Sequence, residues 1–324
     1  MAVDLSLNIA FIVGGLVALF FGAEWLVRGA ARIALMVGIS PLVVGLTVVA
    51  FGTSAPELLV CLEANADNQP DVALGNVIGS NICNIGLILG IAAIMRPVVI
   101  HKQIVRKEMP ILVVVSLLFI GMLHNGMVSR FEGGILFLGV VAYTVVSIIQ
   151  SRKEESEDDF GELAEEDIVA AKTGGAKEVW TNIFFILLGL AVLKFGSDFL
   201  VRGGDYVARY FGVDDAIIAL FLFAFGTSLP ELATSIVAVR KGEGDLIVGN
   251  AIGSCIFNLL AVIGITAMVK PIAEGEIEML DKLVMLGFTV GIFAFMWSSM
   301  KIKRWEGILL CLIYLCYSVV RAQM

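Results

Sequence analysis

Two glutamates lie near the middle of long apolar segments, where a charged side chain is unusual. Glu57 ends the run Ala-Phe-Gly-Thr-Ser-Ala-Pro-Glu, and Glu231 ends the run Ala-Phe-Gly-Thr-Ser-Leu-Pro-Glu. An ionisable group inside an apolar span is energetically costly and is therefore a functional candidate by default. A buried ion pair is the structural alternative, but Lys194 is the one basic residue well inside such a segment. We therefore interpret the two glutamates as candidate cation ligands.

Hydroxyl and amide side chains recur at helical spacing around both glutamates. Thr53 precedes Glu57 by four residues, and Thr227 precedes Glu231 by the same number. Residues four apart share one face of a helix, so each threonine is expected on the face of its glutamate. Two further pairs have this spacing: Ser80 with Asn84, and Ser254 with Asn258.

Proline is predicted to break the helix beside each glutamate. Pro56 and Pro230 lack the N–H that a continuous helix needs, which frees main-chain carbonyls around Ala50 and Ala224. Carboxylates, hydroxyls, amides and carbonyls together make an all-oxygen cage. Such a cage suits Na⁺ or Ca²⁺, and Ca²⁺ takes about 6–8 oxygen ligands at roughly 2.3–2.6 Å. The sequence has no cluster of His or Cys that would favour a transition metal.

The composition excludes a soluble globular protein. Of the 324 residues, 59% are hydrophobic and 16% are charged, and the mean hydropathy is +0.95. Soluble domains are about 45–50% apolar, so the excess must face a lipid bilayer. The five cysteines lie in apolar runs without Cys-x-x-Cys spacing, which predicts buried thiols rather than disulfides or a zinc site. We expect no prosthetic group and no nucleic-acid partner.

Ten segments are long and apolar enough to span a membrane as helices. Their approximate bounds are 7–27, 41–62, 72–95, 108–124, 132–150, 182–201, 215–239, 246–269, 282–299 and 306–321. No basic region precedes Leu5, so we expect a first span and not a cleavable signal peptide. Short loops join the spans except at 151–177, an acidic segment that we interpret as a solvated linker.

Basic residues are distributed unequally between the two sides of the membrane. Loops numbered alternately place fifteen Lys and Arg residues on one side and six on the other. The positive-inside rule assigns the basic side to the cytoplasm. Both termini are then predicted to face outward, and the linker at 151–177 to face the cytoplasm. A compact chain with short loops favours the plasma membrane of a prokaryote.

The strongest signal is an internal repeat at a constant offset of 174 residues. Ala50–Leu58 returns as Ala224–Leu232, and Gly75–Asn84 returns as Gly249–Asn258. The same offset relates three shorter matches: Leu26–Gly29 with Leu200–Gly203, Pro97 with Pro271, and Arg130–Gly133 with Arg304–Gly307. An offset that holds without a gap over most of the chain indicates duplication.

The number of spans in each copy predicts how the copies are related. Each copy contains five predicted spans, so the second copy must enter the membrane from the opposite side. The predicted fold is all-α, with ten transmembrane helices in two inverted five-helix repeats at 1–150 and 178–324, joined by the linker at 151–177. Inverted repeats are an architecture of secondary transporters, whose binding site lies at the repeat interface near the midplane.

Two smaller features accompany the serine–asparagine pairs. Gly-x-x-x-Gly at 75–79 and 249–253 predicts close helix packing. The residue after each serine differs between the copies, Asn81 in the first and Cys255 in the second. It lies about 100° round the helix from the serine, so we expect it to face packing and not ions.

These motifs resemble those of a known family. Gly-Thr-Ser-x-Pro-Glu followed by Gly-Asn-x-x-Gly-Ser, present twice, is similar to the alpha-repeats of the calcium/cation antiporter superfamily, specifically its sodium/calcium exchanger branch. The resemblance covers nearly the whole chain. It implies a secondary antiporter, not an enzyme, that exchanges Ca²⁺ for Na⁺ by alternating access at one calcium site and several sodium sites.

The resemblance also implies roles for individual residues. Glu57 and Glu231 would be the calcium-binding acids. The other ligands of Ca²⁺ or Na⁺ would be Thr53, Thr227, Ser54, Ser228, Ser80, Ser254, Asn84, Asn258 and the carbonyls of Ala50 and Ala224. The first and sixth helices, which carry Glu24 and Arg28 and then Asp198 and Arg202, resemble the pair that slides across the core in this family.

One departure from the family pattern leaves the coupling ion open. Many sodium/calcium exchangers carry Asp where this chain has Asn258, so the site holds two formal negative charges, matched by one Ca²⁺ or two Na⁺. An H⁺-coupled Ca²⁺/cation antiporter is the closest alternative, and K⁺ is also open as a transported ion. A cation channel is less favoured, because channels usually build filters from symmetry-related subunits. An intramembrane enzyme would need catalytic residues beyond the two glutamates, and we find none nearby.

Overall fold

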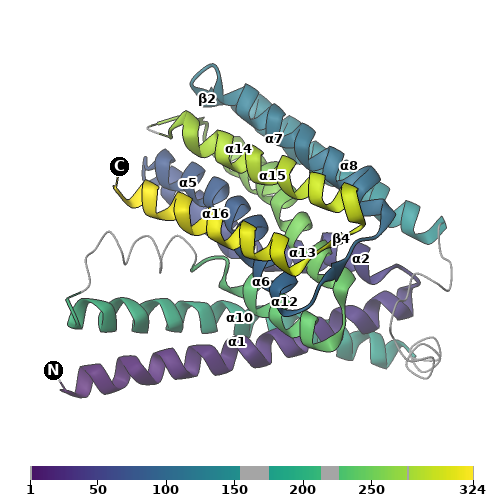
Figure 1. Cartoon of the computed structure of the whole chain (residues 1–324), viewed down its shortest axis with the longest axis horizontal. Coiled ribbons are helices and arrows are strands. Elements are labelled where there is room, and N and C mark those ends of the chain that lie inside the picture. The colour runs from purple at the N-terminus through teal and green to yellow at the C-terminus, as the bar shows by residue number, and fades with distance from the viewer. Residues whose placement is uncertain (1, 154–174, 213–225, 276, 324) are drawn as a thin grey trace.

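The computed structural model describes residues 2–153, 175–212, 226–275 and 277–323, which form helices and two short sheets (Figure 1). The first copy contains α1 (Ala2–Val37), α2 (Pro41–Val44), η1 (Gly45–Val49), α3 (Ala50–Thr53), α4 (Ala55–Ala66), α5 (Pro70–Cys83), η2 (Asn84–Ile88), α6 (Leu89–Met95), β1 (Val98–Val99), η3 (Ile104–Glu108), α7 (Met109–Leu123), β2 (Met127–Val128) and α8 (Arg130–Lys153). The second copy contains α10 (Ala176–Tyr210), α12 (Leu229–Lys241), α13 (Gly244–Phe257), η6 (Asn258–Val262), α14 (Ile263–Val269), β3 (Ile272–Ala273), α15 (Met279–Ser299), β4 (Lys301–Ile302) and α16 (Arg304–Gln323). The segments labelled η are π-helical turns.

Where they are described, the predicted spans are helical, but α1 and α10 extend well beyond the predicted 7–27 and 182–201. Six described helices are long and apolar enough to cross a membrane, and the bent pair 41–53 and 55–66 makes a seventh if it is one span. The ten-span count therefore stays a prediction. Residues 215–225 of the seventh predicted span, and 154–174 of the predicted acidic linker, lie outside the described residues.

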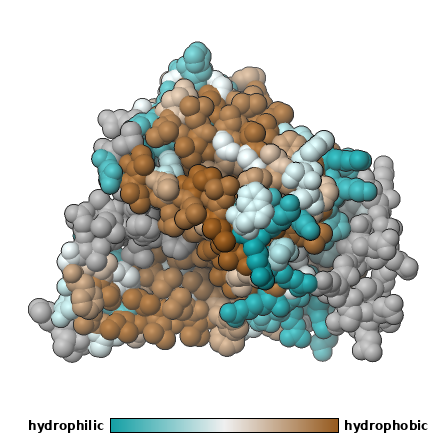
Figure 2. Space-filling model, viewed as in Figure 1, coloured by the Kyte–Doolittle hydropathy of each residue, from teal (hydrophilic) through white to brown (hydrophobic). Residues whose placement is uncertain are grey.

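The outer surface is apolar, as a bilayer requires. Leu16, Phe131 and Trp297 are among many large apolar side chains that are exposed. In Figure 2 most of the visible face is brown, and the teal residues gather mainly at the lower right and at the top. The prediction that all five cysteines are buried is wrong for Cys316, which lies on an exposed face of α16, and for Cys311, which is half-buried. The apolar exterior and the long apolar helices place this chain in a membrane.

Helices α1 and α10 form an antiparallel pair that lies along one edge of the molecule (Figure 1). A Cβ built on Gly15 would lie 2.7 Å from the carbonyl oxygen of Gly196, so the two backbones touch there. Gly22 and Gly189 meet in the same way two turns along, where the distance from a Cβ on Gly22 to the Gly189 oxygen is 2.9 Å. Small residues that repeat every seven positions keep this contact on one stripe of each helix.

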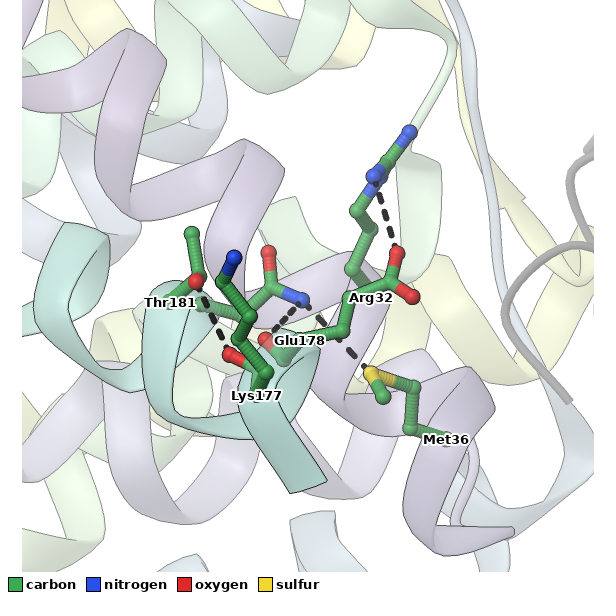
Figure 3. A network of polar contacts seen from close by, with 6 residues as sticks. Arg32, Met36, Lys177, Glu178 and Thr181 are labelled. Carbon is green, nitrogen blue, oxygen red and sulfur yellow. Dashed lines mark hydrogen bonds and ion pairs between the residues drawn. The ribbon is translucent and has the colours of Figure 1, made fainter. Parts of the chain in front are cut away.

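Polar contacts tie one end of this pair together (Figure 3). Nη1 of Arg32 on α1 lies 3.3 Å from Oε1 of Glu178 on α10. Nδ2 of Asn182 donates to the carbonyl of Glu178 at 3.0 Å and lies 3.5 Å from the sulfur of Met36. A partly exposed ion pair contributes little to stability. We infer that the glycine stripe, and not these polar contacts, sets the spacing of α1 and α10.

Pairs of contacts related by the 174-residue offset show that the two copies pack with approximate twofold symmetry. Strand β1 pairs with β4, and β2 pairs with β3, both antiparallel. Adding 174 to the residue numbers of β1 gives β3, and adding it to those of β2 gives β4. The close contact of Gly133 with Gly264 likewise corresponds to that of Gly307 with Gly90. Because α1 and α10 begin the two copies and run antiparallel, the copies point in opposite directions, as inverted repeats require.

The predicted breaks beside the glutamates are present. Helix α3 ends at Thr53 and α4 begins at Ala55, with a bend of 40° between the two helical segments. In the second copy α12 begins at Leu229, directly before Pro230. Each glutamate therefore stands in the first turn of a new helix. Unpaired N–H groups and the positive end of the helix dipole favour a negative charge in that turn.

A substitution in the glycine stripe tests how far α1 depends on close approach to α10. Gly15→Ala places a methyl group against the α10 backbone, so we expect it to destabilise the protein by about 1–3 kcal/mol. Gly14→Ala is the matched control, because Gly14 is exposed and has no atom within 4 Å of its built Cβ. Thermal unfolding in detergent checks both variants. Equal melting temperatures for the two would contradict the proposed role of the stripe.

Candidate ion-binding site

The two glutamates lie together in the core, where the two broken helices meet. Glu57 begins α4 and Glu231 begins α12, and both side chains are 0% exposed. The two carboxylates are close enough to interact electrostatically. In the described chain neither carboxylate has a hydrogen-bond partner or a basic residue paired with it. The structural alternative of a buried ion pair is therefore absent from the described residues.

Each glutamate adjoins at least one hydroxyl side chain from the opposite copy. Ser80 on α5 and Thr227 of the second copy adjoin Glu57. Thr53 and Ser54 of the first copy adjoin Glu231. The threonine four residues before each glutamate therefore lies beside the other glutamate. The two copies thus form one shared site.

Buried polar atoms without a partner concentrate at this site. Within the described residues, thirteen buried side-chain oxygen or nitrogen atoms lack a hydrogen bond. Ten of them belong to predicted site residues: both carboxylate oxygens of Glu57 and of Glu231, the hydroxyls of Ser54, Ser80 and Ser228, both amide atoms of Asn84, and Oδ1 of Asn258. Natural proteins satisfy nearly all buried polar groups, so such a cluster indicates a bound ligand. Its oxygen-rich, anionic chemistry fits a cation.

The remaining predicted residues reach the site with partners of their own. The Thr53 hydroxyl donates to Oδ1 of Asn250 at 3.1 Å and lies 3.5 Å from the Ser254 hydroxyl. The Ala50 carbonyl still accepts the Ser54 N–H at 3.0 Å, because Pro56 removes a donor from a later turn and not from this one. The Thr53 hydroxyl also lies 3.4 Å from that oxygen. The prediction that proline frees the carbonyl of Ala50 is therefore wrong. Ala224 lies outside the described residues.

Asn76 and Asn250 contact the site and were missed in the sequence. The Thr227 hydroxyl donates to Oδ1 of Asn76 at 3.3 Å, which repeats the contact of Thr53 with Asn250. When the hydroxyl hydrogen points to an amide oxygen, the hydroxyl lone pairs are left for a cation. Each asparagine precedes its serine by four residues, so the helical spacing that identified the other pairs could have identified these.

A second missed residue links the site to α10. Pro230 cannot donate to the Gly226 carbonyl four residues before it. That oxygen accepts the Leu229 N–H at 3.3 Å and the hydroxyl of Ser197 on α10 at 2.6 Å. The neighbouring helix therefore supplies a donor in place of the one that proline lacks. No motif in the sequence around Ser197 indicated this contact, because it depends on how α10 packs against the second copy.

The asparagine predicted to face packing also contacts the site. Asn81 is buried, and its side chain crosses to the second copy, where Oδ1 accepts Nδ2 of Asn258 at 3.1 Å and Nδ2 donates to the Cys255 carbonyl at 3.3 Å. It is thus in the packed interface as expected. It is also in direct contact with a predicted ligand, which was not expected.

Glycines in the second copy permit the close packing that brings these residues together. A Cβ on Gly249 would lie 2.7 Å from the Leu42 carbonyl oxygen, and one on Gly253 would lie 2.8 Å from that of Leu46. Helix α13 therefore lies directly against α2 and η1 of the first copy, as its motif predicts. The partners that the 174-residue offset assigns to Gly75 and Gly79 fall at 216–220, outside the described residues.

Two π-helical turns begin at the asparagines that complete the site. Asn84 opens η2, and Asn258 opens η6, each directly after the helix that carries its serine. A π-helical turn within an α-helix frequently marks a functional site, because it redirects side chains and loosens the main-chain hydrogen bonding. The two turns therefore lie where the polar side chains must converge.

Known proteins resemble this chain over nearly its whole length. The family model described as "Sodium/calcium exchanger protein" matches residues 7–149 and 181–323, which are the two copies. The sodium/calcium exchanger MaX1 of Methanosarcina acetivorans is 30% identical over 349 aligned positions, covering 98% of this chain and 99% of that protein. The inner membrane protein YrbG of Escherichia coli strain K12 is 37% identical over 309 positions, covering 93% of this chain and 92% of that protein.

The fold also matches a solved structure. The sodium-calcium exchanger NCX_Mj, in crystals soaked with 10 mM Na⁺ and 10 mM Sr²⁺, superposes with a TM-score of 0.81 at 28% identity, over 96% of this chain and 97% of that one. Matches in sequence family, in full-length relatives and in three-dimensional structure are thus in agreement. The chain belongs to the sodium/calcium exchanger protein family, a family of membrane antiporters.

Proposed function

We propose that this protein exchanges Ca²⁺ for Na⁺ across a plasma membrane by alternating access at the site of Glu57 and Glu231. The cluster of buried oxygen atoms without partners around two unpaired carboxylates is the observation that carries the proposal. The names of MaX1 and NCX_Mj, both sodium/calcium exchangers, support it. Ca²⁺ and Na⁺ are transported ions here and not resident cofactors.

The charge of the site explains why the two ions would exclude each other. Two carboxylates balance one Ca²⁺ or two Na⁺, and either load uses the same oxygens. Full occupancy by both would leave a large uncompensated positive charge in a medium of low dielectric constant. Competition for shared ligands is sufficient to couple the two fluxes when access to the site alternates between the two sides of the membrane.

Proton coupling is the second candidate. Asn258 is neutral and contributes no third negative charge, so the site offers less charge to a further Na⁺. Each glutamate is also able to carry a proton in place of a cation. These observations favour an H⁺-coupled Ca²⁺/cation antiporter as the alternative, which the uptake experiment below separates from the first.

Different contacts of α1 and α10 with the core support alternating access. On one side a cavity of about 400 Å³ lies between α10 and the core, and its lining includes Pro56 and Thr227 beside the site. On the other side Nζ of Lys241, at the end of α12, lies 2.6 Å from Oε1 of Glu24 on α1. The basic-residue distribution predicts that the second side is cytoplasmic. Among the described residues, the arrangement leaves a cavity on the outward side of the site and an ion pair on the inward side.

Calcium uptake by proteoliposomes tests the proposed exchange. Vesicles loaded with Na⁺ should take up radioactive Ca²⁺, whereas vesicles loaded with K⁺ should not. Glu57→Gln removes one of two carboxylates at nearly constant volume, and we expect it to lower uptake on the order of 100-fold. Uptake driven only by a proton gradient would assign the protein to the H⁺-coupled alternative. A Glu57→Gln variant with normal uptake would show that the site is wrong.

Reversal of the Glu24–Lys241 pair tests the closed side. Lys241→Glu sets two carboxylates against each other, so we expect the initial uptake rate to change roughly fivefold, the effect of about 1 kcal/mol. Adding Glu24→Lys restores the pair with its charges exchanged and should recover most of the wild-type rate. Asp205→Asn is the control, because it breaks an ion pair within α10 that does not bridge two helices. Failure of the double variant to recover would argue against the pair as a tie.

A further inference from the structure

An asparagine beside a cation must present the correct end of its amide. The amide oxygen attracts a cation, whereas the NH₂ group repels it, and the two ends have nearly the same shape. Asn258 is 0% exposed, and its Oδ1 has no partner in the described chain. Whether that oxygen or the NH₂ group faces the ions therefore depends on what holds the other end.

Asn81 supplies an acceptor for the NH₂ group of Asn258. Nδ2 of Asn258 donates to Oδ1 of Asn81 at 3.1 Å, across the contact between η6 and α5. Rotating the Asn258 amide by 180° would set two amide oxygens against each other. In a buried site no bulk water would relieve that contact, so the rotated state is disfavoured.

The Asn81 amide is itself held in one orientation. Its Nδ2 donates to the main-chain carbonyl of Cys255 at 3.3 Å. A carbonyl oxygen only accepts hydrogen bonds, so the NH₂ group must lie on that side and Oδ1 must face Asn258. The sulfur of Met285, 3.9 Å from the same nitrogen, is a further weak acceptor there. The Cys255 carbonyl thus fixes the orientation of the Asn81 amide, and Asn81 in turn fixes that of the Asn258 amide.

The first copy lacks this arrangement, which provides an internal comparison. The residue that corresponds to Asn81 is Cys255, and the ligand that corresponds to Asn258 is Asn84. Neither amide atom of Asn84 has a hydrogen-bond partner in the described chain. A thiol is a weak donor and acceptor and cannot impose an amide orientation as an amide oxygen does. One of the two equivalent ligands is therefore oriented by its neighbour, and the other is not.

We propose that Asn81 is a positioning residue that turns the oxygen of Asn258 toward the transported cations. It acts through Asn258 and does not itself bind an ion. The inference rests on the proposed function in one respect, namely that Asn258 contacts a cation during transport. It extends that function by naming the residue that orients the neutral amide of Asn258 as a ligand. The corresponding amide, Asn84, has no such residue beside it.

Kinetics of the Asn81 and Asn258 variants test this role. Asn81→Leu keeps the branched shape of the side chain and removes the acceptor, so we expect the apparent KM for Ca²⁺ or Na⁺ to rise roughly tenfold with kcat little changed. Asn258→Ala should raise KM by at least as much. Asn81→Leu added to Asn258→Ala should have no further effect, because its target is gone. Ile82→Val, at the next buried position of α5, is the control and should leave KM unchanged.

A direct measurement separates this inference from the proposed function. Stabilisation of the purified protein by Ca²⁺ or Na⁺, followed as a shift in melting temperature, reports ion binding without requiring coupled exchange. If wild-type uptake does not need Na⁺, the proposed coupling fails, and the binding shifts still decide the role of Asn81. Should Asn81→Leu not fold, Asn81→Cys, which installs the residue of the second copy, replaces it. Unchanged ion binding in a folded Asn81 variant, or effects of Asn81 and Asn258 that simply add, would overturn the inference.

Discussion

The structure depends on keeping two carboxylates in the middle of a membrane protein without a basic partner. Desolvation makes a bare carboxylate at that depth very costly, and in the described chain nothing but a bound cation or a proton can neutralise Glu57 and Glu231. The protein reduces the cost by placing each at a helix N-terminus, which the adjacent prolines make possible. The remaining desolvation cost favours the binding of a cation. The same buried charges therefore destabilise the empty site and drive ion binding.

Duplication is what allows one chain to build such a site. Because the copies run in opposite directions, the broken helices approach from opposite sides and their first turns meet at the centre. Thr53 of the first copy then lies beside Glu231, and Thr227 of the second beside Glu57. Neither copy alone provides a complete set of oxygens. Glycines at two interfaces, between α1 and α10 and between α13 and η1, bring the backbones close enough for these short side chains to reach across.

The two copies differ at a few positions whose contacts are therefore not related by the twofold symmetry. The exchange of Asn81 for Cys255 orients one asparagine and leaves its counterpart unoriented. The tie between Glu24 and Lys241 also has no equivalent charge pair, since the offset relates these residues to Asp198 and Asp67, which are both acidic. A transporter whose two halves were identical would have no preferred facing. In the proposed mechanism, differences of this kind would give one facing a lower free energy than the other.

The sequence by itself determined the membrane class, the duplication and the family resemblance, and it identified the two glutamates as candidate cation ligands. It could do so because hydropathy, a constant offset and helical spacing are local or periodic properties of the chain. It also indicated the breaks at Pro56 and Pro230, which follow from the chemistry of proline. Tertiary structure alone decided which copy supplies the neighbours of each glutamate, and that Asn81 contacts Asn258. The contact of Ser197 with the Gly226 carbonyl could be found only from the packing of α10 against the second copy. Such contacts join residues far apart in sequence, and a one-dimensional pattern holds no record of which helices lie side by side.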